Sequence, residues 1–121
     1  MSNTCSCSCG FSADNQNFKT VKPEEFSKEI QSPDIFLVDV RKDDEFKDGH
    51  IKGAFNLDVT DPDFEKNAEK ELPKDKTIAV YCGSGKRSAM AASKLTDLGF
   101  KVLNMDGGLT AWIAAGLPVE K

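Results

Sequence analysis

The stretch IAVYCGSGKRSAMAASKL, residues 78–95, indicates the fold most clearly. An apolar run ends at Cys82, a loop rich in glycine and basic residues follows, and an alanine-rich segment comes next. A short apolar run of this kind is typical of a strand buried on both faces of a parallel sheet. In the segment after the loop, apolar residues recur at helical spacing. The stretch therefore predicts a strand, a loop and a helix in succession.

The same alternation extends along the chain. Strand-like segments occupy residues 18–21, 34–40, 53–57, 77–81 and 101–105. Helical segments occupy residues 22–30, 43–49, 61–72, 87–99 and 107–116. Repeated strand–helix alternation predicts an α/β domain with a mostly parallel sheet. We place this domain over residues 18–121, after a Ser- and Cys-rich tail over residues 1–17.

Composition limits the function classes. With 121 residues, 39% of them hydrophobic, the chain fits one domain around a single core. The net charge of −4 argues against broad nucleic-acid binding, and no segment is apolar for long enough to cross a bilayer. Residues 1–10 lack the basic and apolar regions of a secretory signal. We therefore expect a cytoplasmic location, with a periplasmic one as the alternative if a signal has been removed.

The four cysteines fall into two groups, because Cys5, Cys7 and Cys9 alternate in the tail and Cys82 stands alone in the domain. Neighbours two residues apart are poorly placed to bridge one another, so no disulfide framework is predicted. Thiolates suit zinc or copper(I), but a zinc site wants about four ligands and no fourth Cys or His lies nearby in the sequence. We expect a disordered tail, with metal binding or a processing or lipidation signal as the alternatives.

The loop after Cys82 favours chemistry at its sulfur. In an open parallel sheet, ligands bind beyond the carboxyl ends of the strands, and the next helix points its free N–H groups toward that place. Curled backbone amides form an anion-binding nest, and two basic side chains add positive charge. These features favour the thiolate and attract an anion, which suits nucleophilic attack by sulfur. The alternative is that Cys82 is only a small core residue.

The candidate site residues follow from this loop. Cys82 is the candidate nucleophile. The candidate substrate-binding residues are Gly83, Ser84, Gly85, Lys86 and Arg87. The candidate supporting residues are Asp39, Arg41 and Ser88.

Three separated motifs resemble those of the rhodanese-like sulfurtransferases, specifically the small single-domain kind. FLVDVRKDDEFKDGHIKGAFNL (residues 36–57) is similar to the first signature of that family, and VYCGSGKRS (residues 80–88) is similar to its active-site loop. MDGGLTAWIAAGLPV (residues 105–119) is similar to its closing segment. The resemblance covers about residues 18–121, and the order of the three motifs makes it specific.

The resemblance implies a five-stranded parallel sheet sandwiched by helices and a ping-pong sulfur transfer. The Cys82 thiolate would take the outer sulfur of a small anion such as thiosulfate, and the resulting persulfide would be stabilised by the amides of residues 83–87. A thiol or cyanide would then accept the sulfur, and a protein could act as donor or acceptor. No metal or organic cofactor, nucleic acid or membrane is implied.

Two other functions stay open. Dual-specificity phosphatases share the fold and use Cys-x5-Arg, whereas the spacing from Cys82 to Arg87 is Cys-x4-Arg, so phosphatase or arsenate reductase activity is the first alternative. A non-enzymatic persulfide carrier or docking module is the second. Gly83 stands where many family members have arginine or a bulky residue, and Cys-Gly-Ser-Gly resembles the mercaptopyruvate-using branch. The doubly basic loop suits a small dianion better, so thiosulfate is the preferred donor.

Several other side chains have structural interpretations. Arg87 either contacts the anion or turns outward to a carboxylate such as Asp39 or Glu45. Arg41 and Glu45, four residues apart, are expected to form an ion pair. Asp39 ends a strand at the same sheet edge as Cys82. The resemblance assigns the single histidine, His50, to a turn-fixing hydrogen bond, and Trp112 is expected to pack in the core.

Overall fold

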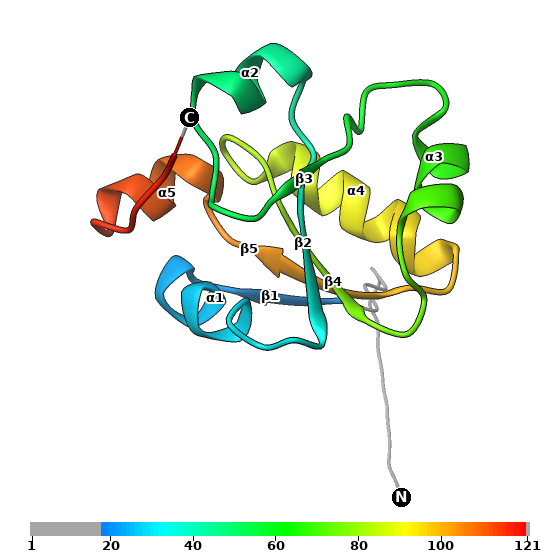
Figure 1. Ribbon diagram of the computed structural model, residues 1–121, viewed down its shortest axis with the longest axis horizontal. Coiled ribbons are helices and arrows are strands. Elements are labelled where there is room, and N and C mark those ends of the chain that lie inside the picture. Colours follow the sequence, from blue (N-terminus) through cyan, green and yellow to red (C-terminus); the bar gives the residue numbers. More distant parts are fainter. Residues whose placement is uncertain (1–17, 121) are drawn as a thin grey trace, which may run out of the picture.

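A computed structural model describes residues 18–120 as an α/β domain with a five-stranded sheet in the order β1-β5-β4-β2-β3 (Figure 1). Every strand pairing is parallel. The strands are β1 (Lys19–Val21), β2 (Ile35–Asp39), β3 (Phe55–Asn56), β4 (Thr77–Tyr81) and β5 (Lys101–Met105). The α/β prediction and the five-stranded parallel sheet are confirmed. The tail expected over residues 1–17 lies outside the described residues.

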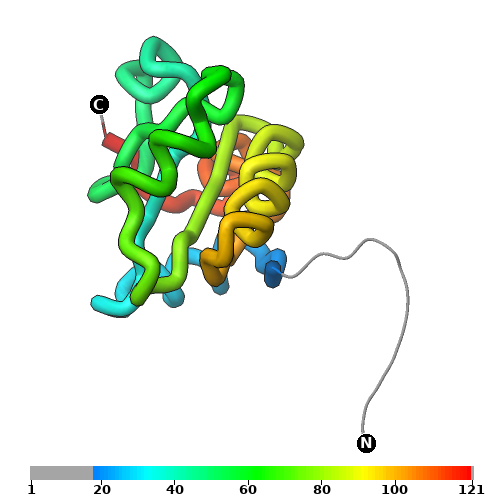
Figure 2. Tube along the Cα trace, turned by 90° about the vertical axis from the view of Figure 1, so that its right-hand side faces the viewer, coloured from blue at the N-terminus to red at the C-terminus, as the bar shows by residue number. Residues whose placement is uncertain are grey.

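Helices cover both faces of the sheet. Helices α1 (Pro23–Glu29) and α5 (Gly108–Ala114) pack on one face, and α3 (Phe64–Glu71) and α4 (Lys86–Asp97) pack on the other. The fifth helix, α2 (Asp43–Asp48), buries no side chain and follows the carboxyl end of β2. Figure 2 shows α2 and the start of β1 toward opposite ends of the molecule.

An apolar core lies on each face of the sheet, between the strands and the helices that cover that face. Successive strand residues point to opposite faces, so the five-residue strands β2, β4 and β5 contribute to both cores. The core under α3 and α4 contains Val38, Ile78, Val80, Val102, Phe64, Ala91 and Leu95. The core under α1 and α5 contains Leu37, Ala79, Leu103, Met105, Phe26, Leu109 and Trp112. The Trp112 ring meets the Phe26 ring edge-on, with centroids 6.4 Å apart, so the expected core role of Trp112 is confirmed. The central strand β4 contributes residues to both cores.

The predicted elements appear in the predicted order. The strands β4 and β5 match their predicted ranges, α4 begins one residue earlier than predicted, and the other elements are shorter. The strand expected over residues 53–57 is reduced to β3. The helix expected over residues 61–72 begins only at Phe64. The Asp61 carboxylate accepts a hydrogen bond from the backbone N–H of Asp63 at 2.9 Å, which holds the residues before the helix in a turn. Across residues 18–120, no helix is long and apolar enough to cross a membrane.

Candidate functional site

Cys82 lies at the carboxyl end of β4 and is fully buried. The backbone N–H of Gly85 donates a hydrogen bond to its Sγ at 2.9 Å. Gly85 has a φ of 100°, a left-handed conformation that costs glycine little, and it caps α4. The loop therefore returns toward the sulfur and starts the helix at Lys86, so that the positive end of the helix dipole faces the sulfur.

The first turn of α5 packs directly on the backbone of this loop. The N–H of Leu109 donates to the Cys82 carbonyl at 2.7 Å, and the N–H of Thr110 donates to the Gly83 carbonyl at 3.0 Å. A Cβ on Gly108 would lie 2.5 Å from the Cys82 carbonyl oxygen. Two chain segments thus meet backbone to backbone, which only a residue without a side chain allows at this point.

The loop is also held from within. The Ser88 hydroxyl donates to the Gly85 carbonyl at 3.2 Å, and Ser88 is fully buried. The contact joins the first turn of α4 to the residue that caps the helix. Ser84 is exposed, whereas Gly83 and Gly85 are half-buried, so the outer surface of the loop is open above Ser84.

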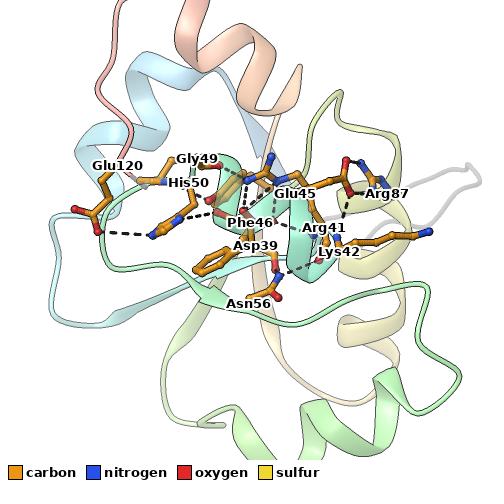
Figure 3. A network of polar contacts seen from close by, with 12 residues as sticks. Asp39, Arg41, Lys42, Glu45, Phe46, Gly49, His50, Asn56, Arg87 and Glu120 are labelled. Atoms are coloured by element: carbon orange, nitrogen blue, oxygen red, sulfur yellow. Dashed lines mark hydrogen bonds and ion pairs between the residues drawn. The ribbon is translucent and has the colours of Figure 1, made fainter.

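Arg87 binds Glu45 on α2 (Figure 3), and a Cβ on Gly83 would lie 3.5 Å from its Nη2. The two guanidinium nitrogens donate to the two carboxylate oxygens at 2.7 and 3.1 Å, so the pair is bidentate. The hydrogen bond from Arg87 lowers the pKa of Glu45 to about 2, and the backbone N–H of Lys42 adds to the effect. The same hydrogen bond raises the pKa of Arg87, to which the charge of Cys82 also contributes. Of the two orientations considered for Arg87, the outward one is observed.

The predicted Arg41–Glu45 ion pair is wrong. Arg41 instead binds the buried carboxylate of Asp39, with Nη2 to Oδ2 at 2.7 Å, and also donates to the Gly49 carbonyl. Burial disfavours the charge of Arg41, but the hydrogen bonds and charge of Asp39 outweigh this and raise its pKa. A Cβ on Gly83 would lie 3.9 Å from Cδ of Arg41, so the stem of this arginine lines the loop while its charge is neutralised elsewhere.

Lys86 is the loop cation with an uncommitted charge. It is exposed at the first position of α4. Among residues 18–120 it takes part in no ion pair, unlike Arg41 and Arg87. Within the described residues, Lys86 is therefore the loop cation that no carboxylate neutralises, and it stands in the first turn of α4, where helix N–H groups are free of intrahelical partners.

His50 has no contact with the sulfur. Its Nδ1 is 2.9 Å from the Phe46 carbonyl, its ring stacks on the Phe46 ring at 3.9 Å, and its Nε2 is 3.7 Å from Glu120 (Figure 3). The hydrogen bond to the turn is the one that the resemblance implied. Within residues 18–120, no group of three or more His, Cys, Asp or Glu side chains is placed to hold a metal ion.

Sequence reasoning missed two parts of this arrangement. It treated Gly107 and Gly108 only as part of a closing motif, although a pair of glycines before a helix is a signal for a close backbone approach. It also missed the buried hydroxyl of Tyr81, which accepts a hydrogen bond from the N–H of Ile51 at 3.0 Å. Burial raises the pKa of this tyrosine, so it stays a neutral structural anchor.

The model of the rhodanese-like domain family matches residues 22–115, and the chain belongs to this family. A sulfurtransferase from Allochromatium vinosum is 38% identical over 87 residues, which are 71% of this chain and 78% of the relative. A tRNA uridine(34) hydroxylase from Acinetobacter baumannii is 36% identical over 102 residues, which are 81% of this chain but only 32% of that protein.

Solved structures give the same assignment. A rhodanese-related protein from Thermoplasma volcanium matches with a TM-score of 0.75 and 29% identity, covering 85% of this chain and 98% of that one. A thiosulfate sulfurtransferase from Pseudomonas aeruginosa matches with a TM-score of 0.74 and 27% identity, covering 96% of this chain and 22% of that one. The fold and the sulfurtransferase family are therefore established.

Replacing Gly108 with alanine should disturb the loop more than the same change at Gly116. Both glycines have left-handed φ values, 65° and 80°, so each substitution costs about 1–2 kcal/mol of backbone strain. Only at Gly108 does the new Cβ meet the Cys82 carbonyl; at Gly116 nothing lies within 4 Å. We expect Gly108→Ala to be less stable than Gly116→Ala by a further ~1–3 kcal/mol in urea unfolding. Equal losses would contradict the packing described.

The Glu45–Arg87 pair should stabilise the fold in a pH-dependent way. The pKa of Glu45 falls from 4.5 to about 2 on folding, so its stabilising effect is complete above pH 4.5 and is lost as the pH falls toward 2. We expect the stability difference between wild type and Glu45→Gln to be constant near neutrality and to shrink below pH 4.5. Urea unfolding at a series of pH values measures it. Asp43→Asn, which removes an exposed pair with Lys47, serves as the control and should show a small difference.

Proposed function

We propose that this protein transfers the sulfane sulfur of thiosulfate, or of a similar small anionic donor, to a thiophilic acceptor through a persulfide on Cys82. The observation that carries the proposal is the hydrogen bond from the Gly85 N–H to Sγ at 2.9 Å, at the positive end of α4. An amide donor and a helix dipole aimed at one sulfur favour its anionic forms, both the thiolate and the persulfide.

In the first half-reaction, the Cys82 thiolate attacks the outer sulfur of thiosulfate. A bond forms between Sγ and that sulfur, the sulfur–sulfur bond of the donor breaks, and sulfite leaves with the electron pair. In the second half-reaction, the acceptor attacks the outer sulfur of the persulfide, and the pair returns to Sγ. The charge on the outer sulfur develops beside the free amides of the loop, where preorganised donors stabilise it without reorganisation.

The cation that meets the donor is Lys86. Arg41 and Arg87 form ion pairs with Asp39 and Glu45, and Gly83 has no side chain that could bind the donor. A single exposed ammonium beside helix amides suits a small dianion, which supports thiosulfate over a larger carboxylate donor. The bidentate pairing of Arg87 also argues against the phosphatase alternative, because that chemistry needs the arginine to face the bound anion.

Purified protein supplied with thiosulfate and cyanide should release thiocyanate, and mass spectrometry should find one extra sulfur atom on Cys82. Cys82→Ser should abolish both, because serine cannot form a persulfide. A folded wild-type protein that gains no sulfur and shows no turnover would reject the proposal. Hydrolysis of an aryl phosphate by wild type, with thiosulfate inert, would favour the phosphatase instead.

Lys86→Gln should raise the KM for thiosulfate about tenfold with a smaller effect on kcat, because a charge-assisted contact contributes about 1.5 kcal/mol. Added salt should raise the KM of wild type more than that of the variant, since an exposed charge is screened. Lys28→Gln, an exposed lysine in the last turn of α1, is the matched control and should leave the KM unchanged. An equal rise in both variants would refute a specific role of Lys86.

A further inference from the structure

Arg87 stands beside the loop with its guanidinium bound to Glu45, and no step of the sulfur transfer above uses either side chain. We propose that Glu45 determines the anion selectivity of the loop, because it keeps the guanidinium of Arg87 from binding strongly hydrated oxyanions such as inorganic phosphate. The inference rests on the proposed function, since it takes the loop after β4 as the donor site. It adds a specificity-determining residue that lies on a different helix from the loop.

Arg87 is placed where it would contact an anion bound at the loop. It lies in the first turn of α4, and a Cβ on Gly83 would lie 3.5 Å from its Nη2. Its side chain is 29% exposed, so an anion above the loop reaches it from solvent. The hydrogen bond to Glu45 is the main cause of the raised pKa of Arg87, and the charge of Cys82 raises that pKa further. The guanidinium is therefore within electrostatic range of the sulfur, and its hydrogen bonds are taken by Glu45.

The carboxylate of Glu45 is held by its own helix as well as by Arg87. Its Oε1 accepts a hydrogen bond from the backbone N–H of Lys42 at 3.1 Å, at the start of α2. The same oxygen accepts Nη1 of Arg87 at 2.7 Å, and Oε2 accepts Nη2 at 3.1 Å. Figure 3 shows the carboxylate and the guanidinium facing each other. A carboxylate that the backbone already orients is a preorganised acceptor, which favours the pair over a competing anion.

The pair is charged at every pH at which sulfur transfer is measured. The hydrogen bond from Arg87 lowers the pKa of Glu45 to about 2, so the carboxylate is ionised throughout the neutral range. The guanidinium stays protonated at all these pH values. Glu45 therefore neutralises Arg87 constantly, and its effect on selectivity does not depend on pH near neutrality.

Phosphate and thiosulfate differ in what they need from such a site. Phosphate is strongly hydrated, and proteins replace its water with several donors, often the paired N–H groups of an arginine. Thiosulfate presents a large, soft sulfur to the thiolate, and that end of the anion holds water weakly. A loop whose arginine is already bound to a carboxylate leaves phosphate with an unmade contact, and an unmade contact discriminates against the anion that needs it.

The balance of charge around the loop supports this assignment. Asp39 neutralises Arg41 and Glu45 neutralises Arg87, whereas Lys86 takes part in no ion pair within residues 18–120. An incoming dianion thus meets one ammonium group and the N–H groups of the first turn of α4. Removing the charge of Glu45 would add a second cation, with two parallel donors. This addition should favour phosphate more than thiosulfate.

Phosphate binding by the full-length protein tests the inference without any sulfur transfer. Titration calorimetry at constant ionic strength and neutral pH compares wild type with Glu45→Gln, which keeps the size of the side chain and removes its charge. We expect inorganic phosphate to bind Glu45→Gln about tenfold more tightly, the effect of one charge-assisted contact. In turnover with thiosulfate and cyanide, the Ki of phosphate should fall by the same factor. The KM for thiosulfate should change by less than about threefold, because thiosulfate depends less on the arginine.

Two variants separate the release of Arg87 from a general change of charge. Asp44 lies beside Glu45 in the first turn of α2 and takes part in no ion pair among the described residues. Asp44→Asn therefore removes a nearby negative charge without freeing the arginine, and it should bind phosphate as wild type does. The double variant Glu45→Gln with Arg87→Gln lacks both the pair and the guanidinium, so it should lose the gain in phosphate affinity.

A second substitution guards against a loss of stability in Glu45→Gln. The pair is partly exposed on a helix that buries no side chain, so the domain should stay folded without it, and urea unfolding checks this for each variant. Glu45→Ala also removes the hydrogen-bond acceptor, and it should bind phosphate at least as tightly as Glu45→Gln.

The outcomes separate the inference from the proposed function. Equal phosphate affinity in wild type and the folded Glu45 variants overturns the inference. So does an equal gain in Asp44→Asn, or a gain that persists in the double variant. If wild type still loads Cys82 with sulfur in these cases, the proposed function stands. If Cys82 acquires no sulfur from thiosulfate, the proposed function fails, and calorimetry still decides whether Glu45 keeps phosphate from the loop.

Discussion

The backbone contact between the first turn of α5 and the loop after β4 is the constraint on which the site depends. Two amides of α5 bind the carbonyls of Cys82 and Gly83, and Gly108 has no side chain to hold the segments apart. The carbonyls of Cys82 and Gly83 are thus bound to α5, while the Gly85 N–H donates to the sulfur. The anionic character proposed for Cys82 rests on that second hydrogen bond.

Two ion pairs divide the positive charge around the loop. Asp39 neutralises Arg41 below it, and Glu45 neutralises Arg87 beside it. Both arginines shape the loop through fixed, bidentate hydrogen bonds, which suits their planar guanidinium groups. Lys86 takes part in no ion pair among the described residues, and it is the loop cation to which we assign the anion in the proposed function.

The sequence predicted the fold almost completely because strong local patterns specify it. The apolar run before Cys82 and the helical spacing after it predict that the thiol lies at the carboxyl end of a strand in a parallel sheet. Every predicted helix and strand is present in the structure. The choice of partners for Arg41 could not be predicted in the same way. Glu45 lies four residues from Arg41, a spacing that favours an ion pair on a helix. A fully buried carboxylate such as Asp39, however, is destabilised more by the lack of a cation than the partly exposed carboxylate of Glu45. That preference depends on burial, which spacing alone does not reveal. The contact of Gly108 with the loop joins distant segments and has no local signature beyond the glycine pair.

The last described residue, Glu120, is bound to the segment that follows α2. Glu120 and His50 exchange two backbone hydrogen bonds, each 2.8 Å long, as an isolated antiparallel bridge. His50 follows α2, and α2 carries Glu45, which binds Arg87 of the loop (Figure 3). The backbone at Glu120 is therefore hydrogen-bonded to the segment directly after the helix that holds this arginine. A change that breaks this bridge would release the segment that follows α2, and α2 carries the carboxylate that holds Arg87 of the loop.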